Sequence, residues 1–459
     1  MKRKTKIKLG LLTLLLVGVG CWVASRWNAC FYNSPEAPYI PSATPHRVLL
    51  TFGNDGPQSR NISWQCDTVL RPSYLEVIDP LLPDTFRKEA NGEVFESRSG
   101  KAAYYSTTLR HLRNDGEYRY RVVTGGKASP WYTFCVPDDT RNSISFLFFG
   151  DIQDTIGGKT KTYITEAVDH YPDTDMLLFG GDFIERPKDL YYEEAFRGLD
   201  EVAQTIPSLV VPGNHEYLKY PIRKLERRFS LVFSYFLNSM IGENHVYTLQ
   251  YGDAQIYLLD SNRELPYLIT QREWLKKELA QSKARWNIVV LHHPVYSIKS
   301  STNNLVQRAV FADVLNDNVD LVLQGHEHAY ARMTQHENGK AVPPVYTVSH
   351  CSPKHYRIQF DAERFDRYGC GSQYYQRITI SGDTLSMCTY DANTHELYDE
   401  VDIVKGEHDL ARIVDRAAHL PERLEFQARL GKKKDQRFLQ RIAERQASRQ
   451  AARQRVGAE

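Results

Sequence analysis

Five short motifs in this 459-residue sequence combine residue types that bind metal ions. Each motif places Asp, Asn or His beside a Gly or Pro, directly after an apolar run that is typical of a buried strand. The motifs are Gly150-Asp151-Ile152-Gln153, Gly181-Asp182-Phe183-Ile184-Glu185, Gly213-Asn214-His215-Glu216, His292-His293-Pro294 and Gly325-His326-Glu327-His328. Ligands of open α/β sheets collect at the carboxyl ends of the strands. We therefore expect these side chains to converge on one crevice, although a single such motif is a weak signal.

Together these residue types suit a pair of metal ions. Carboxylate, amide and imidazole ligands favour zinc, iron or manganese, and no cysteine lies in the motifs. Two such ions about 3.5–4 Å apart can share one carboxylate, clamp both oxygens of an in-line displacement and generate hydroxide at neutral pH. The glycines permit tight turns and the close approach of a bulky anion. The residue types thus predict a dinuclear metal site that could promote an in-line displacement on a bulky anion.

The order of the five motifs resembles that of the calcineurin-like metallophosphoesterase superfamily. The longer string Gly325-His326-Glu327-His328-Ala329-Tyr330-Ala331-Arg332, behind an N-terminal β-sandwich, is similar more narrowly to the purple acid phosphatases. The resemblance covers roughly residues 40–400. It implies an α/β fold class, in which a fibronectin type III-like β-sandwich precedes a four-layer α/β/β/α metallophosphoesterase domain and a C-terminal helical tail follows.

The resemblance also implies a role for each motif residue. Asp182 would bridge the two metals, Asp151 and His328 would hold the first metal, and Asn214, His292 and His326 would hold the second. His215 would sit beside the substrate phosphate and protonate the leaving group or steady the transition state. This agrees with the residue type, because imidazole titrates in the range that general acid catalysis needs. His293 would either contact the substrate or pack beside the ligands.

Two positions depart from the family pattern. The superfamily often has His two positions after the first Asp, where this chain has Gln153. Purple acid phosphatases have a tyrosine ligand three positions after the bridging Asp, where this chain has Glu185. Both residues are further candidate metal ligands, through a carbonyl or carboxylate oxygen. Because the tyrosinate colours the ferric enzymes, we expect this protein to be colourless or pale and leave the metal pair open among Fe, Zn and Mn.

The elements that must position these residues alternate between apolar runs and amphipathic helices, over a predicted catalytic domain at residues 143–404. Strands are expected within 144–151, 175–182, 208–215, 245–249, 255–260, 287–293 and 319–324, with helices near 158–170, 190–204, 270–281 and 305–316. Segments 343–350, 374–380 and 384–390 indicate further strands. This alternation by itself predicts a largely parallel sheet with helices on both faces.

A separate pattern precedes the catalytic domain. Residues 38–137 contain short alternating runs bounded by Gly and Asx turns, which is typical of a β-sandwich of about 100 residues. Trp64 would be its buried aromatic residue. The segment carries no constellation of polar residues that would bind a ligand, so we expect a structural domain.

The first 30 residues have the pattern of an export signal or anchor. Five cations precede residue 9, and Leu9 to Ser25 is an uncharged run of 17 residues, near the lower limit for crossing a bilayer. Three outcomes are open: lipoprotein cleavage at Gly20-Cys21, cleavage near Ala24 or Ala29, or retention as a membrane anchor. In an exported chain, Cys66 with Cys135 or Cys351 with Cys370 could form disulfides, but spacing does not establish connectivity.

A basic tail is expected at residues 405–459, because no strand signal follows Gly406. Arginines recur every four residues along one stripe of a predicted helix, at positions 437, 441, 445, 449 and 453. The stripe suits contact with an anionic lipid surface or polyanion, but we favour a solvated terminal helix.

These observations lead to one principal functional hypothesis. The chain is expected to be an exported dinuclear-metal phosphoesterase that hydrolyses phosphomonoesters by in-line attack of a metal-bound hydroxide. A phosphodiesterase with the same metal core is the enzymatic alternative, and a degenerate surface-binding scaffold is the non-enzymatic one. The formal net charge of only +2 gives no overall case for nucleic-acid binding, so the expected partners are a phosphorylated small molecule or other phosphoester and, through the N-terminus, a membrane.

Overall fold

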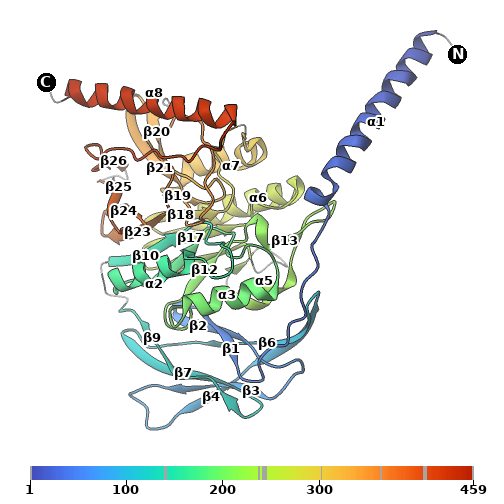
Figure 1. Cartoon of the computed structure of the whole chain (residues 1–459). Helices are drawn as coiled ribbons and strands as arrows, with labels where there is room; N and C mark the ends of the chain where they lie inside the picture. Colours follow the sequence, from blue (N-terminus) through green and yellow to red (C-terminus); the bar gives the residue numbers. More distant parts are fainter. Residues whose placement is uncertain are drawn as a thin grey trace.

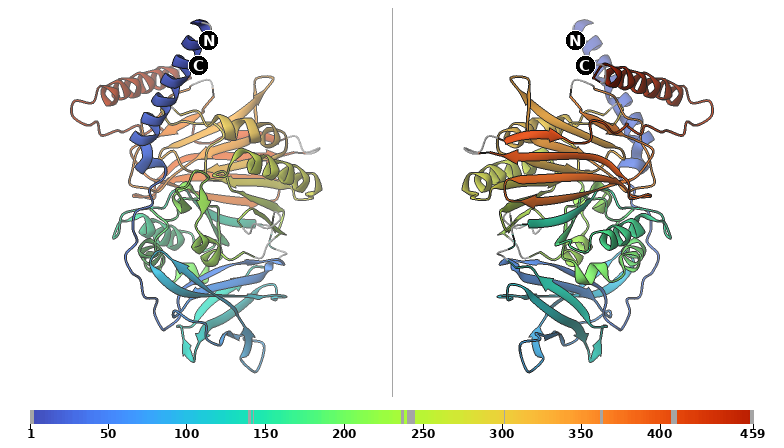
Figure 2. Two further views of the ribbon diagram at one scale, coloured as in Figure 1. Left: turned by 90° about the vertical axis from the view of Figure 1, so that its right-hand side faces the viewer. Right: turned by 90° about the vertical axis from the view of Figure 1, so that its left-hand side faces the viewer.

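The computed structural model describes residues 3–138, 141, 143–235, 238–239, 245–300, 302–361, 364–406 and 411–456. Figure 1 shows a β-sandwich at one end, a larger α/β body on top of it, and a long N-terminal helix that projects away from the body. Figure 2 shows that this helix and the C-terminal helix both lie toward the end opposite to the sandwich.

The N-terminal sandwich consists of two antiparallel sheets. One sheet has the order β1-β2-β6-β5, and in the other β4, β3, β7 and β8 follow one another while β9 pairs with β7. The strands are β1 (His46–Gly53), β2 (Gly56–Gln65), β3 (Ser73–Ile78), β4 (Phe86–Glu89), β5 (Asn91–Ser97), β6 (Gly100–Leu109), β7 (Gly116–Thr124), β8 (Lys127–Ala128) and β9 (Tyr132–Val136). The prediction of a sandwich in this region is confirmed.

Trp64 lies in the sandwich core, as expected. Its ring stacks on Tyr105 with 5.6 Å between the ring centroids, and its indole N–H donates to the Thr124 hydroxyl at 2.9 Å. The opposite face of the first sheet contributes Leu49, Phe52 and other residues to the hydrophobic core of the α/β body. The two parts of the chain therefore share buried apolar surface, which stabilises their contact.

The α/β body is built on two mixed sheets. The seven-stranded sheet has the order β12-β11-β10-β23-β24-β25-β26, and the eight-stranded sheet has the order β15-β16-β17-β18-β19-β21-β20-β22. The first contains β10 (Ser143–Phe149), β11 (Met176–Phe179), β12 (Ser208–Val210), β23 (Tyr374–Ser381), β24 (Thr384–Asp391), β25 (Leu397–Lys405) and β26 (Ala411–Asp415). The second contains β15 (Asn238–Ser239), β16 (Tyr247–Tyr251), β17 (Ala254–Leu259), β18 (Trp286–Leu291), β19 (Leu321–Gln324), β20 (Tyr330–Glu337), β21 (Lys340–Val348) and β22 (Arg367–Gly369).

The expectation of one largely parallel sheet, drawn from the alternation alone, was wrong. β10, β11 and β12 are parallel to one another, but β23 joins β10 antiparallel and begins a run of antiparallel strands. Successive residues of β18 show the layering: Ile288 and Val290 enter the core between the sheets, while Val289 and Leu291 enter the core under the helices. This four-layer arrangement is the one that the family resemblance implied.

Helices cover the outer faces of both sheets. α2 (Thr160–His170) and α3 (Asp189–Leu199) contribute to the first hydrophobic core, while α6 (Leu265–Gln281) and α7 (Leu305–Asn318) contribute to the second. Shorter elements complete the body: α4 (Val202–Thr205), a single 3-10 turn at Asn214–Glu216, α5 (Arg227–Val232), and a hairpin of β13 (Tyr217–Leu218) and β14 (Lys224–Leu225). The helix expected at 270–281 begins five residues earlier, with a proline in its first turn.

The segment after Gly406 differs from the prediction in two ways. A strand is present there, because β26 pairs antiparallel with β25 and adds an edge to the seven-stranded sheet. The helix α8 (Lys433–Val456) is also not simply solvated, since Phe438 and Ile442 are buried in the second core. Arg445 of the basic stripe pairs with Glu422 at 2.8 Å. Figure 1 shows α8 lying across the body.

At the N-terminus, α1 (Arg3–Cys30) is a continuous exposed helix. Its segment Gly10–Asn28 is long and apolar enough to cross a membrane, a property that signal sequences share.

Neither of the disulfides considered above is formed, because Cys66, Cys135, Cys351 and Cys370 are all free thiols.

Candidate metal centre

The five predicted motifs lie at the ends of strands in both sheets. Asp151, Asp182 and Asn214 follow β10, β11 and β12, which are neighbours in the seven-stranded sheet. His292 and His326 follow β18 and β19, which are neighbours in the eight-stranded sheet. The carboxylates and the amide thus come from one sheet and these imidazoles from the other, and they meet where the carboxyl ends of the two sheets adjoin.

The polar atoms of these residues are in direct reach of one another. The shortest separations are Gln153 Nε2 to His328 Nε2 at 3.2 Å, His326 Nδ1 to His292 Nε2 at 3.2 Å, His292 Nε2 to Asn214 Oδ1 at 3.3 Å, Asp151 Oδ1 to His328 Nε2 at 3.3 Å and Asp182 Oδ1 to His292 Nε2 at 3.4 Å. Gln153 Nε2 also lies 3.5 Å from Asp182 Oδ2, so all six predicted metal ligands and Gln153 belong to one connected cluster.

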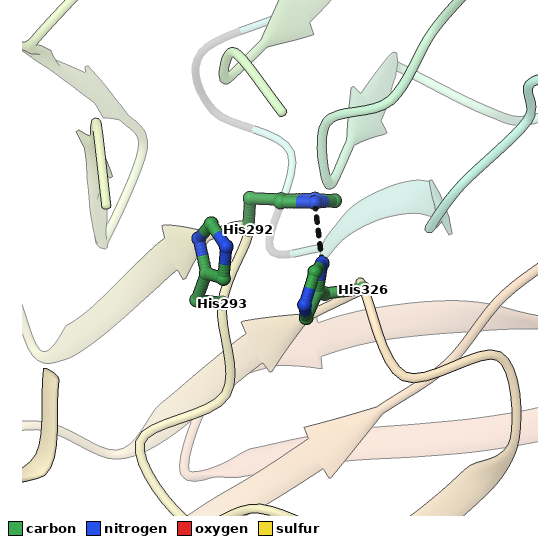
Figure 3. Close-up of side chains that lie close together, drawn as sticks. All are labelled: His292, His293 and His326. Atoms are coloured by element: carbon green, nitrogen blue, oxygen red, sulfur yellow. Dashed lines mark hydrogen bonds between the residues drawn. The ribbon is translucent and has the colours of Figure 1, made fainter. Parts of the chain in front are cut away.

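Two subsets of this cluster have the spacing of a metal site. Asp151, Asp182 and His292 form one, and His292, His293 and His326 form the other, with ligand atoms within 4.8 Å of one another in each. Figure 3 shows the three histidines of the second subset, whose rings gather around a common space. His293 was expected to contact substrate or to pack, and its place in this subset makes it a further candidate ligand.

The orientation of the imidazoles is set by the backbone. His292 Nδ1 lies 2.9 Å from the Gly180 carbonyl oxygen, and His328 Nδ1 lies 3.0 Å from that of Lys354. His215 Nδ1 lies 2.6 Å from the Glu185 carbonyl oxygen. In each case Nδ1 carries a proton and donates it to the carbonyl oxygen, which leaves Nε2 as the nitrogen available to the cluster. Such outer hydrogen bonds orient histidines at metal sites.

Burial and charge give these groups unusual proton affinities. Burial and the neighbouring His292 lower the pKa of His293 to about 3, and burial together with His293 holds the pKa of His326 well below its ordinary value. Burial opposes the charged form of His292, but Asp182 outweighs it and raises the pKa to about 10. Burial likewise opposes the Asp182 carboxylate, yet His292 and His215 keep its pKa well below the usual range. The charged Asp182 carboxylate and the neutral imidazoles of His293 and His326 are the forms in which these groups bind a cation.

The residues present fit a pair of metal ions. Asp151 Oδ1 and Gln153 Oε1 are buried oxygens that accept no hydrogen bond within the described part of the chain. A buried acceptor without a partner is costly, and coordination to a cation would satisfy both atoms. The side chain of Gln153 thus lies where a ligand would lie. The Glu185 carboxylate is instead engaged by Lys354 Nζ at 2.8 Å.

The backbone that carries the ligands is strained. Asp151, Asp182, His326 and His328 all have positive φ, at 47°, 50°, 73° and 40°. Non-glycine residues in this region cost about 1–3 kcal/mol each, and they cluster at functional sites.

The glycines of the motifs allow the ligand loops to approach one another. A Cβ on Gly213 would lie 2.1 Å from the backbone nitrogen of Asp182, and one on Gly325 would lie 2.4 Å from Asp151 Oδ2. The expected reason was room for a bulky anion, whereas the contacts show that the room is needed by the neighbouring ligand loop.

Three supporting residues were not assigned a role from the sequence. Glu216 accepts from the backbone N–H groups of Asp182, Ile184 and Gly213, and burial and Asp182 raise its pKa to about 8. Glu327 accepts from Ser297 Oγ and from the backbone N–H groups of Ile298 and Lys299. The Ser261 hydroxyl oxygen accepts from the backbone N–H of His293 and also lies 3.0 Å from Nδ1 of the His293 ring. Each of these residues follows a strand end. That position could have marked them in the sequence, but only metal ligands and proton donors were sought there.

A cavity of about 470 Å³ opens beside Asn214 and His215. Its walls carry six cationic side chains, from Arg98, Arg186, Lys188, Lys219, Arg223 and Lys354, against the single carboxylate of Glu185. Such a surplus of positive charge favours an anionic ligand.

The sequence matches two family profiles in adjacent regions. The profile described as "Calcineurin-like phosphoesterase" matches residues 144–330, and that described as "Purple acid Phosphatase, N-terminal domain" matches residues 45–136. The two matches correspond to the motif-bearing part of the α/β body and to the sandwich.

Similar proteins include plant phosphatases. Purple acid phosphatase 22 of Arabidopsis thaliana is 26% identical over 359 residues, which cover 72% of this chain and 78% of the relative. Phosphoenolpyruvate phosphatase of Allium cepa is 24% identical, with 63% of each chain covered. Among solved structures, a purple acid phosphatase from yellow lupin (Lupinus luteus) seeds has a TM-score of 0.66 at 15% identity, covering 80% of this chain and 75% of that one. PhoD has a TM-score of 0.60 at 14% identity, covering 92% and 100%. These structural likenesses show the shared fold.

Proposed function

We propose that this chain, which belongs to the calcineurin-like phosphoesterases and is a purple acid phosphatase-like enzyme, is an exported dinuclear-metal phosphomonoesterase. The observation that carries the proposal is the connected cluster of Asp151, Asp182 and His292 with the histidines that face them. Export is supported by the five N-terminal cations followed by the apolar segment of α1.

The described side chains support the following ligand set. Asp182 contacts both His292 and His215 and would bridge the two ions, with Asp151, Gln153 and His328 on one side and Asn214, His292 and His326 on the other. When bound, Fe, Zn or Mn ions would polarise the phosphoryl oxygens and lower the pKa of the attacking water. The protein supplies a buried, strained cradle that orients these ligands before substrate arrives.

His215 would supply the proton that the leaving group needs. Its Nδ1 donates to the Glu185 carbonyl, so the second proton of the charged imidazole resides on Nε2. Nε2 lies 3.8 Å from Asp182 Oδ2, and the ring lines the cationic cavity. Transfer of that proton to the departing ester oxygen is general acid catalysis. The cationic walls favour the doubly charged monoester over the singly charged diester.

Substitution of two ligands tests the proposal. We expect Asp182→Asn and His292→Ala to lose bound metal and to slow phosphate release from an aryl phosphate by more than about 100-fold. Changing a residue that only supports a metal ligand costs up to about 100-fold, so removing a ligand itself should cost more. His336→Ala, which changes an exposed histidine on β20, is the matched control.

Metal analysis and a side-by-side comparison of monoester and diester rates complete the measurement. Unchanged phosphate release from both variants would contradict the assignment. Faster diester cleavage would point to a phosphodiesterase. A purified chain that holds less than one metal per molecule and cannot be reactivated by added metal would indicate a degenerate scaffold.

A further inference from the structure

The chain that follows α1 is bonded firmly to the body. Every residue from 33 to 36 makes a hydrogen bond to a distant part of the fold. The bonds are Asn33 Nδ2 to the Lys219 carbonyl and Lys219 N–H to Asn33 Oδ1, both 2.8 Å, Arg98 to the Ser34 carbonyl at 2.9 Å, Lys188 to the Pro35 carbonyl at 2.7 Å, and Arg228 to Glu36 Oε1 at 2.6 Å. The point where α1 leaves the body is therefore determined by these contacts, whatever direction the helix takes.

This same segment forms a wall of the cavity beside the metal centre. Asn28, Tyr32, Asn33 and Ser34 line the cavity together with His215. Asn28 is also the last residue of the apolar segment that is long enough to cross a membrane. Asn33 follows it by only five residues, which span at most about 18 Å when fully extended. A bilayer crossed by α1 therefore lies next to the mouth of the cavity.

Exposed aromatic residues mark the same boundary. Trp22, Trp27 and Tyr32 have 61%, 56% and 50% of their surface exposed, near the C-terminal end of the apolar segment. Trp and Tyr are enriched where a membrane-spanning helix reaches the headgroup region. The five cations before residue 9 favour an N-terminus on the cytoplasmic side, which leaves the body on the other face.

The hairpin β13–β14 is a second element beside α1 with features that suit contact with a membrane surface. Its turn exposes Tyr220 and Ile222, at 48% and 69%, although neither side chain covers a core. Lys219, Arg223 and Lys224 flank these two residues. Figure 1 shows the hairpin near the base of α1, and the paired bonds of Asn33 with Lys219 join the two. Apolar tips flanked by cations bind anionic lipid surfaces.

We propose that the cavity rim, formed by residues 28–34 and the β13–β14 hairpin, docks on the anionic bilayer that holds α1, so that the enzyme takes phosphomonoesters carried on membrane lipids. This inference rests on the proposed phosphatase function. The lipid headgroup enters the cationic cavity from the bilayer surface. Water adds its oxygen to phosphorus, the bond from phosphorus to the lipid oxygen breaks, and that oxygen takes a proton, which yields inorganic phosphate and a lipid alcohol.

The test uses the full-length chain reconstituted into vesicles of phosphatidylcholine, with or without phosphatidylglycerol. Diacylglycerol phosphate in the vesicle and free glycerol phosphate in solution distinguish the lipid-borne ester from the soluble one. The variant Tyr220→Ser/Ile222→Ser removes the exposed tip of the hairpin. The control Leu81→Ser/Leu82→Ser removes two similarly exposed apolar side chains, at 70% and 53%, from the loop between β3 and β4 of the sandwich.

We expect the hairpin variant to lower the turnover of diacylglycerol phosphate by about tenfold or more, because burial of one such side chain can change an equilibrium by that factor. Glycerol phosphate hydrolysis should stay within about twofold for both variants, and the lipid reaction should be faster on anionic vesicles. Hydrogen exchange at residues 217–225 should slow on vesicles compared with detergent in the wild type and in the Leu81→Ser/Leu82→Ser control, but not in the hairpin variant.

Two results would overturn the docking proposal: hydrolysis of glycerol phosphate without hydrolysis of the lipid phosphate, or equal lipid turnover by the hairpin variant and its control. If neither ester is hydrolysed, the proposed function has failed, and the docking surface is then judged by hydrogen exchange alone. Unchanged exchange of the hairpin on anionic vesicles would reject it.

Discussion

At the scale of single residues, the candidate site depends on side chains that hold strained backbone in place. Asp182 adopts positive φ at the end of β11, and its loop is held by Glu216, which accepts from both Asp182 N–H and Ile184 N–H. His215 N–H in turn donates to Asp182 Oδ1 at 2.8 Å. The central carboxylate is therefore oriented before any ligand binds, which lowers the reorganisation that catalysis requires.

The role of His215 predicts a dependence on the leaving group. His215→Ala should lower kcat by about 10²–10⁴-fold for an alkyl phosphate, whose leaving oxygen needs a proton. The loss should be much smaller for a nitrophenyl phosphate, because its leaving group departs as a stable anion. Steady-state kinetics with both substrates at saturating metal would check this. Equal losses for the two substrates would show that His215 orients the phosphate and does not donate the proton.

At the scale of elements, a buried charge network joins the post-helix segment, the sandwich and the α/β body. Arg228 of α5 contacts Glu36 at 2.6 Å and Asp189 at 2.7 Å, and Arg47 of β1 contacts Asp189 at 2.8 Å. Burial opposes the charged form of Asp189, but Arg228 and Arg47 outweigh it and lower its pKa. The network links parts of the chain that are far apart in sequence and keeps residues 33–36 beside the cavity.

Removing the central cation of this network should be strongly destabilising. Arg228→Met removes the buried cation that Glu36, Glu226 and Asp189 share, and breaking a buried ion pair costs about 3–5 kcal/mol of unfolding free energy. Its neighbour Arg227 pairs with Glu93 at the surface, where both side chains are half exposed, and Arg227→Met should cost about 1 kcal/mol or less. Urea unfolding of the two variants provides the comparison. Similar losses would mean that the buried network contributes no more than a surface pair.

At the scale of the whole molecule, the contact between sandwich and body gives stability a dependence on pH. Burial and the adjacent Arg47 lower the pKa of His46 from its ordinary 6.5. His46 Nε2 lies 3.1 Å from the Tyr39 hydroxyl, which also donates to Glu193 of α3. Below about pH 6.5 the unfolded chain therefore binds a proton that the folded chain does not. The free energy of unfolding consequently decreases as the pH is lowered through this range.

Replacing this imidazole should flatten that dependence. We expect the unfolding free energy of His46→Gln to fall less steeply than that of the wild type as the pH decreases below about 6.5. At higher pH the two proteins should differ by a constant amount, because His46 is neutral in both states. Denaturant unfolding at a series of pH values measures the slopes. Parallel slopes on the acid side would show that His46 does not contribute to the acid sensitivity.

The sequence by itself determined the elements and the residues of the cluster. Strands such as 144–149 and 287–291 were predictable because alternation and apolar runs are local, and a polar residue at a strand end is equally local. For the same reason Asp151, Asp182, Asn214, His292, His326 and His328 could be named before their contacts were known.

Only the tertiary structure decided what these elements do together. The division into two sheets, the edge strand β26, the packing of α8 and the cavity wall built from residues 28–34 all depend on contacts between distant residues. The roles of Glu216 and Gly213 belong here too, since each is defined by what a neighbouring loop brings within reach. Local patterns record how a segment folds, whereas pairing and approach are set by the balance of burial and hydrogen bonding over the whole chain.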